Sequence, residues 1–175
     1  MTLSTDKAAG IALLVLDVDG VLTDGRIAMG RDGSETPIKR FHVHDGLGIR
    51  LLQSAGIEVV LLTGRNDEAT LRRAQELDLH VSAGISDKPA EFARILEDRG
   101  LATCQAAVMG DDLPELPLFG IAGLSLAPAN ARPEIREAAD WVADAAGGDG
   151  AVREAAEALI RARGAWEEAL ARFRL

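Results

Sequence analysis

Short apolar runs alternate with amphipathic stretches along most of the chain, and this rhythm constrains the fold more than any other feature. The runs are residues 11–16, 58–62, 106–109 and 121–126, and the stretches lie at about 46–55, 67–77, 88–99 and 131–139. Strands that alternate with helices pair in parallel through right-handed crossovers, with helices on both faces of the sheet. The sequence therefore predicts an α/β fold with a doubly wound, Rossmann-like parallel sheet.

Two segments depart from this rhythm. Residues 22–43 have no helical period and contain a turn signal at Asp32-Gly33, which predicts a projecting β-hairpin flap. Residues 147–150, "GGDG", have the composition of a flexible linker, and an Ala-rich helix interrupted by Gly164 follows them. A length of 175 residues fits one domain, which we expect to span residues 1–175.

Charge and cysteine content restrict the partners and the compartment. The formal net charge of -9 argues against nucleic acid, which requires a basic patch. Cys104 is the one cysteine, so an intrachain disulfide is excluded and a reducing compartment is indicated. No apolar run approaches membrane-spanning length, and Asp6 falls where a signal peptide would begin its apolar region. We expect a cytoplasmic protein that binds neither membrane nor nucleic acid.

Two carboxylates close the first apolar run, in the stretch "LDVDGVLTDG". In an extended chain Asp17 and Asp19 point to the same side, so both can face one small volume. Such carboxylates repel each other unless a cation lies between them or one is protonated. A calcium loop of the EF-hand type is excluded, because its sixth and twelfth positions would be Leu22 and Ala28 instead of Gly and Glu.

Three later strand-to-helix junctions add polar residues of complementary kinds. They are Thr63, Gly64 and Arg65 in "LLTGR", Lys88 before a proline in "SDKPAEF", and Asp111 with Asp112 in "MGDDLPEL". Each junction alone has an ordinary structural explanation, such as a helix cap or a surface lysine. Together they fall at the ligand-binding end of one parallel sheet, which favours a shared site.

The combination of residue types at these junctions matches the needs of phosphoryl transfer. Carboxylates are hard oxygen ligands for Mg²⁺, which keeps several waters and also binds substrate phosphate. A carboxylate can attack phosphorus and form an aspartyl-phosphate. Lysine, threonine and exposed amides can neutralise the equatorial phosphoryl oxygens. The sequence therefore predicts a Mg²⁺-dependent phosphoryl-transfer enzyme.

The motifs "DVDGVLTDG", "TGR", the lysine of "SDK" and "GDDLPEL" resemble, in order, the four motifs of the haloacid dehalogenase superfamily of phosphatases. The resemblance covers residues 11–164, nearly the whole chain. "FHVHDGLGIRLL" and "GGDGAVREAAEALI" are similar to the small, cap-less branch that acts on keto-sugar acid phosphates. Arg65 stands where a nine-carbon phosphatase of that branch carries glutamate, so the resemblance favours the eight-carbon substrate of lipopolysaccharide biosynthesis. The nine-carbon 9-phosphate stays as an alternative.

The resemblance also implies roles for individual residues. Asp17 would be the nucleophile and Asp19 the general acid and base, while Thr63 and Lys88 would hold the phosphoryl group. The implied Mg²⁺ ligands are the Asp17 carboxylate, the Asp19 backbone carbonyl and Asp111, with Asp112 bound to or beside them. The implied substrate-binding residues are Arg65, Gly64, His44 and Gly46. His44 replaces a usual arginine and Glu115 a usual aspartate, so the local geometry could differ at both positions.

The resemblance further implies a homotetramer. The flap of about twenty residues is too small to be a lid domain. In the family, flaps from four subunits form a central barrel, and a neighbour's C-terminal tail reaches the active site. A tail that packs on its own domain is the alternative. For residues 165–175 the resemblance identifies no counterpart.

Three other classes compete with a phosphatase. A response-regulator receiver needs an aspartate at the end of the third strand and a late lysine, but the strand near residues 80–82 ends in Ala83 and Gly84, and no lysine follows Lys88. A catalytically silent oligomerisation domain would be expected to lose a motif residue, yet all are present. A dehalogenase has no alkoxide leaving group for Asp19 to protonate.

Overall fold

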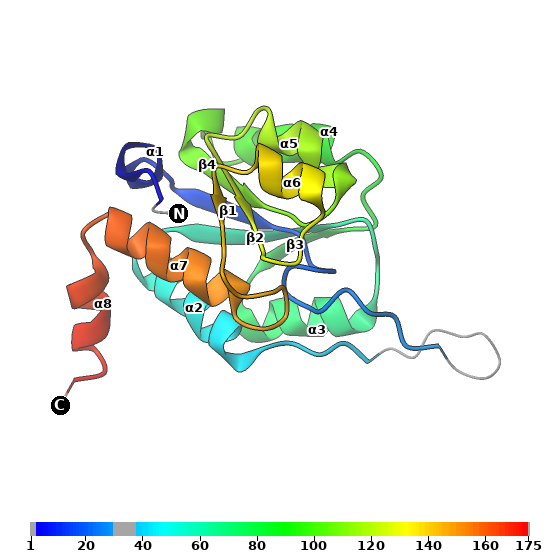
Figure 1. Ribbon diagram of the computed structural model, residues 1–175, viewed down its shortest axis with the longest axis horizontal. Coiled ribbons are helices and arrows are strands. Elements are labelled where there is room, and N and C mark those ends of the chain that lie inside the picture. Colours follow the sequence, from blue (N-terminus) through cyan, green and yellow to red (C-terminus); the bar gives the residue numbers. More distant parts are fainter. Residues whose placement is uncertain (1–2, 30–37, 175) are drawn as a thin grey trace.

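The computed structural model describes residues 3–29 and 38–174. A parallel sheet of six strands forms its centre, in the order β3-β2-β1-β4-β5-β6 (Figure 1). The strands are β1 (Leu13–Leu16), β2 (Glu58–Thr63), β3 (His80–Ala83), β4 (Ala106–Met109), β5 (Leu124–Ala127) and β6 (Trp141–Val142). The chain starts in the middle and winds first to one edge and then to the other. This order confirms the predicted doubly wound sheet.

Helices cover both faces of the sheet (Figure 1). The helices on the face below the sheet in that view are α2 (Val43–Ser54), α3 (Glu68–Leu77) and α7 (Ala151–Ala162). Those on the face above it are α4 (Lys88–Glu97), α5 (Leu116–Phe119) and α6 (Pro133–Ala138). A short α1 (Thr5–Ala9) packs against α7 through the buried Ala8.

The central strand β1 shows why its apolar run is unbroken. Leu14 and Leu16 belong to the core under α2 and α7, whereas Leu13 and Val15 belong to the core under α4 and α6. All four side chains are at most 1% exposed. Side chains that alternate between two covered faces must all be apolar, so the run carries no period-2 pattern.

The predicted flap is described only along its two limbs. Residues 22–29 and 38–42 contain no strand beyond a single bridge residue, Met29, and α2 begins at Val43. The expected turn at Asp32-Gly33 lies outside the described residues. The described limbs therefore do not show the paired strands that the sequence predicted for a hairpin.

The prediction of a flexible linker at residues 147–150 is wrong for its first two glycines. The Gly147 amide donates to Asn130 Oδ1 at 2.7 Å, and the Gly148 amide donates to the Val21 carbonyl at 3.0 Å. A Cβ at Gly147 would lie 1.7 Å from the Gly20 carbonyl oxygen. Glycine is required here because two backbones approach each other closely, and the segment is a packing contact.

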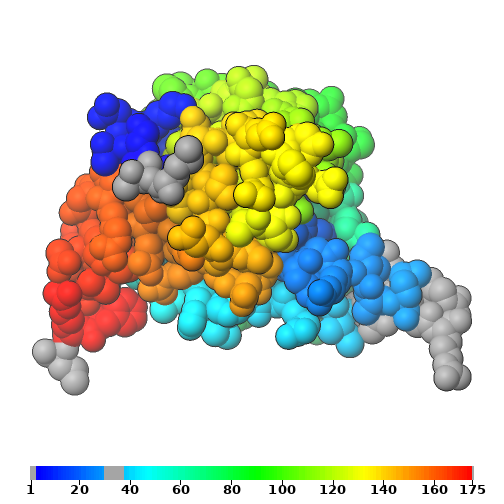
Figure 2. Space-filling model, in the orientation of Figure 1, coloured from blue at the N-terminus to red at the C-terminus, as the bar shows by residue number. Residues whose placement is uncertain are grey.

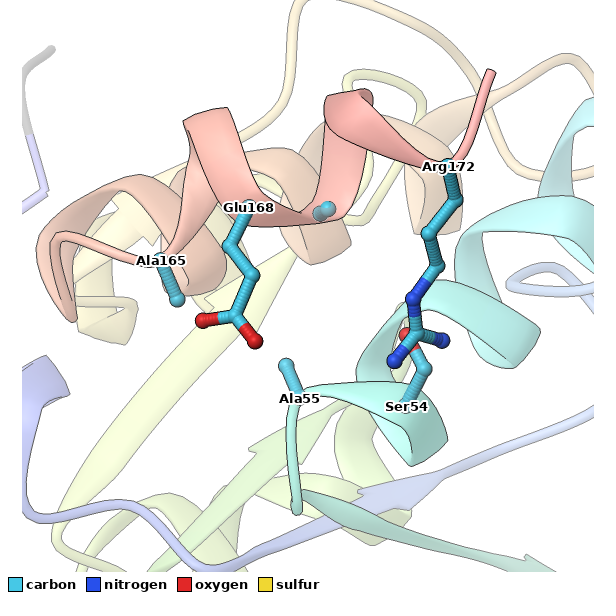
Figure 3. A pocket seen from close by; sticks show the side chains of 6 residues that line it. Ser54, Ala55, Ala165, Glu168 and Arg172 are labelled. Carbon is cyan, nitrogen blue, oxygen red and sulfur yellow. The ribbon is translucent and has the colours of Figure 1, made fainter. Parts of the chain in front are cut away.

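The chain ends in two helices on its own domain. Helix α7 buries Val152, Leu159 and Ile160 in the core, and a kink at Gly164, with φ +70°, separates it from α8 (Trp166–Ala171). Glu168 and Arg172 extend from α8 toward the end of α2 and border a small pocket (Figure 3). Its lining residues are Ser54, Ala55, Ala165, Glu168, Ala169 and Arg172.

Helix α8 lies far from the flap limbs. In the view of Figure 2, α8 (red) and residues 22–29 (blue) occupy opposite ends of the molecule. Helix α7 starts beside the loop after β1 and runs toward the amino ends of the strands, where α8 follows (Figure 1). Within the described residues, no helix combines the length and apolar character needed to cross a bilayer.

Candidate active site

A cleft of about 450 Å³ opens at the carboxyl ends of the central strands. Twelve of its thirteen lining residues belong to the four sequence stretches that carry the predicted site residues, and Ile85 is the other. The lining residues are Asp17, Asp19, Gly25, Thr63, Gly64, Arg65, Ile85, Ser86, Lys88, Asp111, Asp112, Pro114 and Glu115. The structure therefore brings together all the predicted catalytic and metal-binding residues.

Lys88 bridges two carboxylates at the base of the cleft. Its Nζ donates to Asp17 Oδ1 at 2.7 Å and also to Glu115 Oε1. Lys88 and Asp17 are 8% exposed, and Glu115 is 2% exposed. Although burial disfavours the ammonium, the two carboxylates hold the pKa of Lys88 above its ordinary value. Lys88 is therefore a fixed cation beside the predicted nucleophile.

The local sequence explains how Lys88 reaches this position. Asp87 caps α4 by accepting from the Ala90 amide at 3.0 Å, and Pro89 occupies the first turn. A lysine at a helix start opposes the helix dipole. The carboxylates of Asp17 and Glu115 offset the repulsion between the Lys88 charge and the positive end of the helix dipole. The site therefore accounts for a lysine at this position.

Glu115 fits where the family usually has aspartate. A Cβ at Gly110 would lie 2.2 Å from Glu115 Cγ, so the missing side chain of Gly110 makes room for the longer acid. The Asp112 amide donates to Glu115 Oε2 at 3.2 Å, while Oε1 accepts from Lys88. Both carboxylate oxygens of Glu115 are thereby satisfied.

Asp17 and Asp111 are two carboxyls of the cleft that both resist ionisation. Burial, followed by the charge of Asp17, raises the pKa of Asp111 to about 7. Burial raises the pKa of Asp17 to about 6, against the opposing charge of Lys88. A Cβ at Gly20 would lie 2.0 Å from Asp111 Oδ2, so Gly20 leaves the space that this carboxylate occupies.

These acids fit a hard divalent cation. A cation placed between two carboxyls favours their charged forms and would offset the burial that raises both pKa values. In the described part of the chain, no three His, Cys, Asp or Glu side chains gather closely enough to hold a metal by themselves. Mg²⁺ needs only one or two carboxylates and completes its shell with other oxygens. Asp17 and Asp111 are the carboxylates available for this role.

Thr63, Gly64 and Arg65 lie at the end of β2. Thr63 is 1% exposed, and its Oγ1 accepts from the Arg65 amide at 3.2 Å. The Arg65 Nε lies 3.9 Å from Asp19 Oδ2, so its guanidinium faces the cleft. A Cβ at Gly64 would meet its nearest atom, the Ile85 carbonyl oxygen, at an ordinary 3.6 Å. The folded chain therefore has room for a side chain at position 64, and close packing is not the reason for a glycine there.

His44 and Gly46 do not line the cleft. His44 is exposed in the first turn of α2, and its ring packs edge-on against His42 with centroids 4.8 Å apart. Gly46 is buried, and a Cβ there would lie 2.4 Å from Arg73 Nη2. In the described chain these two predicted substrate-binding residues stand apart from the other site residues.

Sequence reasoning missed Lys39. Its Nζ lies 2.9 Å from Asp19 Oδ1 and 2.7 Å from Asp67 Oδ2. Lys39 belongs to no helix or strand, so no periodic pattern marks it. A lysine twenty residues from an acid gives no signal in one sequence, because the path of the intervening chain decides the contact.

The arrangement of a buried lysine-bound carboxylate beside other acids, at the carboxyl end of a doubly wound sheet, is that of a phosphoryl-transfer enzyme. A family model described as haloacid dehalogenase-like hydrolase matches residues 80–154. The 3-deoxy-D-manno-octulosonate 8-phosphate phosphatase KdsC of Salmonella typhi is 44% identical over 164 residues, which are 93% of this chain and 86% of that protein. The chain belongs to the haloacid dehalogenase-like hydrolases.

Solved structures agree with this assignment. The 3-deoxy-D-manno-octulosonate 8-phosphate phosphatase of Moraxella catarrhalis, in complex with a magnesium ion, a phosphate ion and a KDO molecule, is 36% identical. It superposes with a TM-score of 0.92, and the match covers 97% of both chains. The phosphatase of the same name from Yersinia pestis is 40% identical with a TM-score of 0.88, over 93% of this chain and 88% of that chain.

Proposed function

We propose that this protein is a Mg²⁺-dependent phosphatase that converts 3-deoxy-D-manno-octulosonate 8-phosphate to 3-deoxy-D-manno-octulosonate and phosphate, a step of lipopolysaccharide biosynthesis. The observation that carries the proposal is the buried contact between Lys88 and Asp17 in a cleft shared with Asp111. The identity of 44% to a KdsC phosphatase over 93% of the chain supports the choice of substrate.

The reaction has two halves, and Asp17 is the nucleophile of the first. A carboxylate oxygen of Asp17 attacks phosphorus, the ester bond to the sugar oxygen breaks, and the proton of Asp19 passes to that oxygen. In the second half, water attacks the phosphorus of the aspartyl-phosphate while Asp19 accepts its proton. The bond between phosphorus and Asp17 then breaks and releases phosphate.

The other residues of the cleft hold the phosphoryl group and its charge. Lys88 keeps Asp17 in place and neutralises phosphoryl oxygens, and the Thr63 hydroxyl donates to one of them. Asp17, Asp111 and the Asp19 backbone carbonyl would hold Mg²⁺, with Asp112 beside them. When bound, Mg²⁺ supplies the positive charge that brings an anionic substrate into this acidic cleft.

Arg65 is the proposed grip for the sugar-acid part of the substrate. Its guanidinium faces the cleft beside Asp19, the proposed proton donor to the leaving sugar. An arginine can bind a carboxylate through two parallel hydrogen bonds. Gly64, next to it, allows the substrate to approach the backbone. His44 and Gly46 would contribute only if a neighbouring subunit brings them to a cleft.

We further propose a cytoplasmic homotetramer in which each chain is one cap-less domain. Exposed apolar side chains on the flap limbs and at the start of α2 support contact with other copies. They are Ile27, Met29, Ile38 and Val43, exposed by 55%, 58%, 67% and 75%. Because α8 lies far from its own flap, its tail would serve the cleft of a neighbour (Figure 2). The single Cys104 is consistent with a reducing compartment.

Phosphate release with Mg²⁺ from a panel of substrates tests the proposal. The panel contains 3-deoxy-D-manno-octulosonate 8-phosphate, nine-carbon keto-acid 9-phosphates and simple sugar phosphates, with Asp17→Asn as the inactive control. We expect the highest kcat/KM for the eight-carbon substrate. A higher value for a nine-carbon substrate would keep the chemistry and overturn the substrate assignment. No release from any substrate would favour a catalytically silent oligomerisation domain.

Light scattering and truncation test the assembly. The expected particle is a tetramer, and a chain that stops after Ala171, the last residue of α8, should keep the buried Trp166 and its fold but lose activity. A fully active monomer would contradict the tetramer and the role of the tail.

A further inference from the structure

Lys39 contacts the proposed general acid through both of its carboxylate oxygens. Its Nζ lies 2.9 Å from Asp19 Oδ1 and 3.0 Å from Asp19 Oδ2. The side chain of Lys39 is 11% exposed and that of Asp19 is 24% exposed, so solvent screens the pair only in part. An ammonium that contacts both oxygens restricts rotation of the carboxylate about its last bond.

A second set of contacts anchors Lys39 to the start of α3. Its Nζ lies 2.7 Å from Asp67 Oδ2 and donates to Thr70 Oγ1 at 3.1 Å. Asp67 is itself fixed, because it caps α3 by accepting from the Thr70 amide at 2.9 Å and from the Thr70 hydroxyl at 3.0 Å. Burial opposes the Asp67 charge, but the hydrogen bonds from Lys39 and Thr70 outweigh it and hold the pKa of Asp67 below its ordinary value.

These contacts connect a rigid helix end to the acid. A lysine side chain loses much rotamer freedom when it is fixed, so a single exposed partner rarely holds it in one place. Here the Lys39 ammonium contacts Asp67 and Thr70 at the start of α3, and it also contacts Asp19. The position of Asp19 therefore depends on α3 through Lys39.

We propose that Lys39 is a positioning residue that orients Asp19 toward the sugar oxygen of the substrate. The inference rests on the proposed function, because it needs Asp19 to be the proton donor. Lys39 touches neither phosphorus nor the leaving oxygen in this role. It keeps its own protons while the proton of Asp19 passes to the sugar oxygen and the bond from that oxygen to phosphorus breaks.

The leaving group provides a test that a merely structural role would not pass. A sugar alkoxide needs a proton as it leaves, whereas p-nitrophenolate is stable as an anion and leaves without one. General acid catalysis contributes about 10²–10⁴-fold where a proton is needed. For both substrates, kcat/KM reports the steps up to departure of the leaving group, so the later hydrolysis of the aspartyl-phosphate does not enter.

The experiment compares kcat/KM of the full-length protein on 3-deoxy-D-manno-octulosonate 8-phosphate and on p-nitrophenyl phosphate. For Lys39→Met we expect a loss of about 10–100-fold on the sugar phosphate and less than about 3-fold on the nitrophenyl ester. Lys39→Arg keeps the charge and should recover part of the loss. Asp67→Asn keeps an acceptor for the Thr70 amide but removes the carboxylate charge that holds Lys39. It should lower kcat/KM selectively on the sugar phosphate, by a smaller factor than Lys39→Met.

Two controls separate positioning from folding. Glu68→Gln removes an exposed charge from the same helix end, where Glu68 pairs with Arg72, and should leave both substrates unaffected. Thermal unfolding of each variant checks that it is folded. If Lys39→Met does not fold, Asp67→Asn serves as the test in its place. A double-mutant cycle with Asp19→Asn should show that Lys39→Met costs nothing more once the acid is gone.

The outcomes distinguish this inference from the proposed function. Equal losses on the two substrates, or losses that multiply in the double variant, would overturn the role of Lys39. A wild-type protein without Mg²⁺-dependent release from either substrate would overturn the proposed function itself, and the inference with it.

Discussion

Substituting alanine at Gly147 tests whether the segment after β6 holds the catalytic loop in place. The new Cβ would lie 1.7 Å from the Gly20 carbonyl oxygen and 3.1 Å from the Thr23 carbonyl oxygen. The two backbones must then separate by more than 1 Å, since carbon and oxygen normally stay more than about 3 Å apart. Gly20 cannot retreat freely, because Asp111 Oδ2 occupies the space where its own Cβ would be.

The expected cost follows from this geometry. Overpacking of this kind destabilises a protein by about 1–3 kcal/mol. At this chain length that corresponds to roughly 2–4 °C in Tm for each kcal/mol. Activity should fall much further, because a 1 Å misplacement at a reacting centre can cost about 10²-fold. Gly147→Ala should therefore lower kcat/KM about 100-fold while the protein stays folded.

Gly164→Ala is the matched control. Gly164 has φ +70° but no atom within 4 Å of a Cβ, so alanine there strains the backbone without displacing a neighbour. We expect a loss of stability of about 1–2 kcal/mol with kcat/KM close to that of the wild type. Phosphate release and thermal unfolding of both variants are the assays. Wild-type kcat/KM in Gly147→Ala would refute the reasoning.

Two further predictions concern buried charges. Lys88→Met leaves Asp17 and Glu115 facing each other without a cation, and should lower the free energy of unfolding by about 3–5 kcal/mol in urea titrations; a loss below about 1 kcal/mol would contradict the bridge. Burial raises the pKa of Asp45 despite a hydrogen bond of 2.9 Å from the Arg153 amide. The folded chain thus holds the proton of Asp45 more tightly than the unfolded chain. The stability that this proton contributes at low pH is lost as pH rises through the folded pKa of Asp45. Asp45→Asn should remove this loss, so the unfolding free energy of the variant relative to wild type should rise as pH increases above the ordinary aspartate pKa of about 3.9. A constant difference between the two proteins would contradict this.

Elements with a strong local signal were predicted from the sequence. Strands β2 and β4 lie within one residue of the apolar runs at 58–62 and 106–109, because strands covered on both faces carry unbroken apolar runs. Strand β6 has two residues and α5 has four, which is too short for any period to show. Their existence depends on tertiary packing against β5 and the core.

The sequence predicts those site residues that directly follow the ends of strands. Asp17, Thr63, Lys88 and Asp111 meet in one cleft because parallel strands end at the same edge of the sheet. The contact of Lys39 with Asp19 depends on the path of an irregular segment, which no local pattern encodes. The composition around Gly147 predicts a linker because glycine suits both mobility and close packing, and only the neighbouring backbone distinguishes the two.

The most direct test of the account is chemical trapping of the phosphorylated residue. Protein mixed with Mg²⁺ and 3-deoxy-D-manno-octulosonate 8-phosphate is quenched, treated with borohydride and digested for mass spectrometry. Borohydride reduces an aspartyl-phosphate to homoserine, so the account predicts homoserine at position 17, only with substrate and Mg²⁺ present. Phosphate release with Asp17 unmodified, or with homoserine at another aspartate, would contradict it.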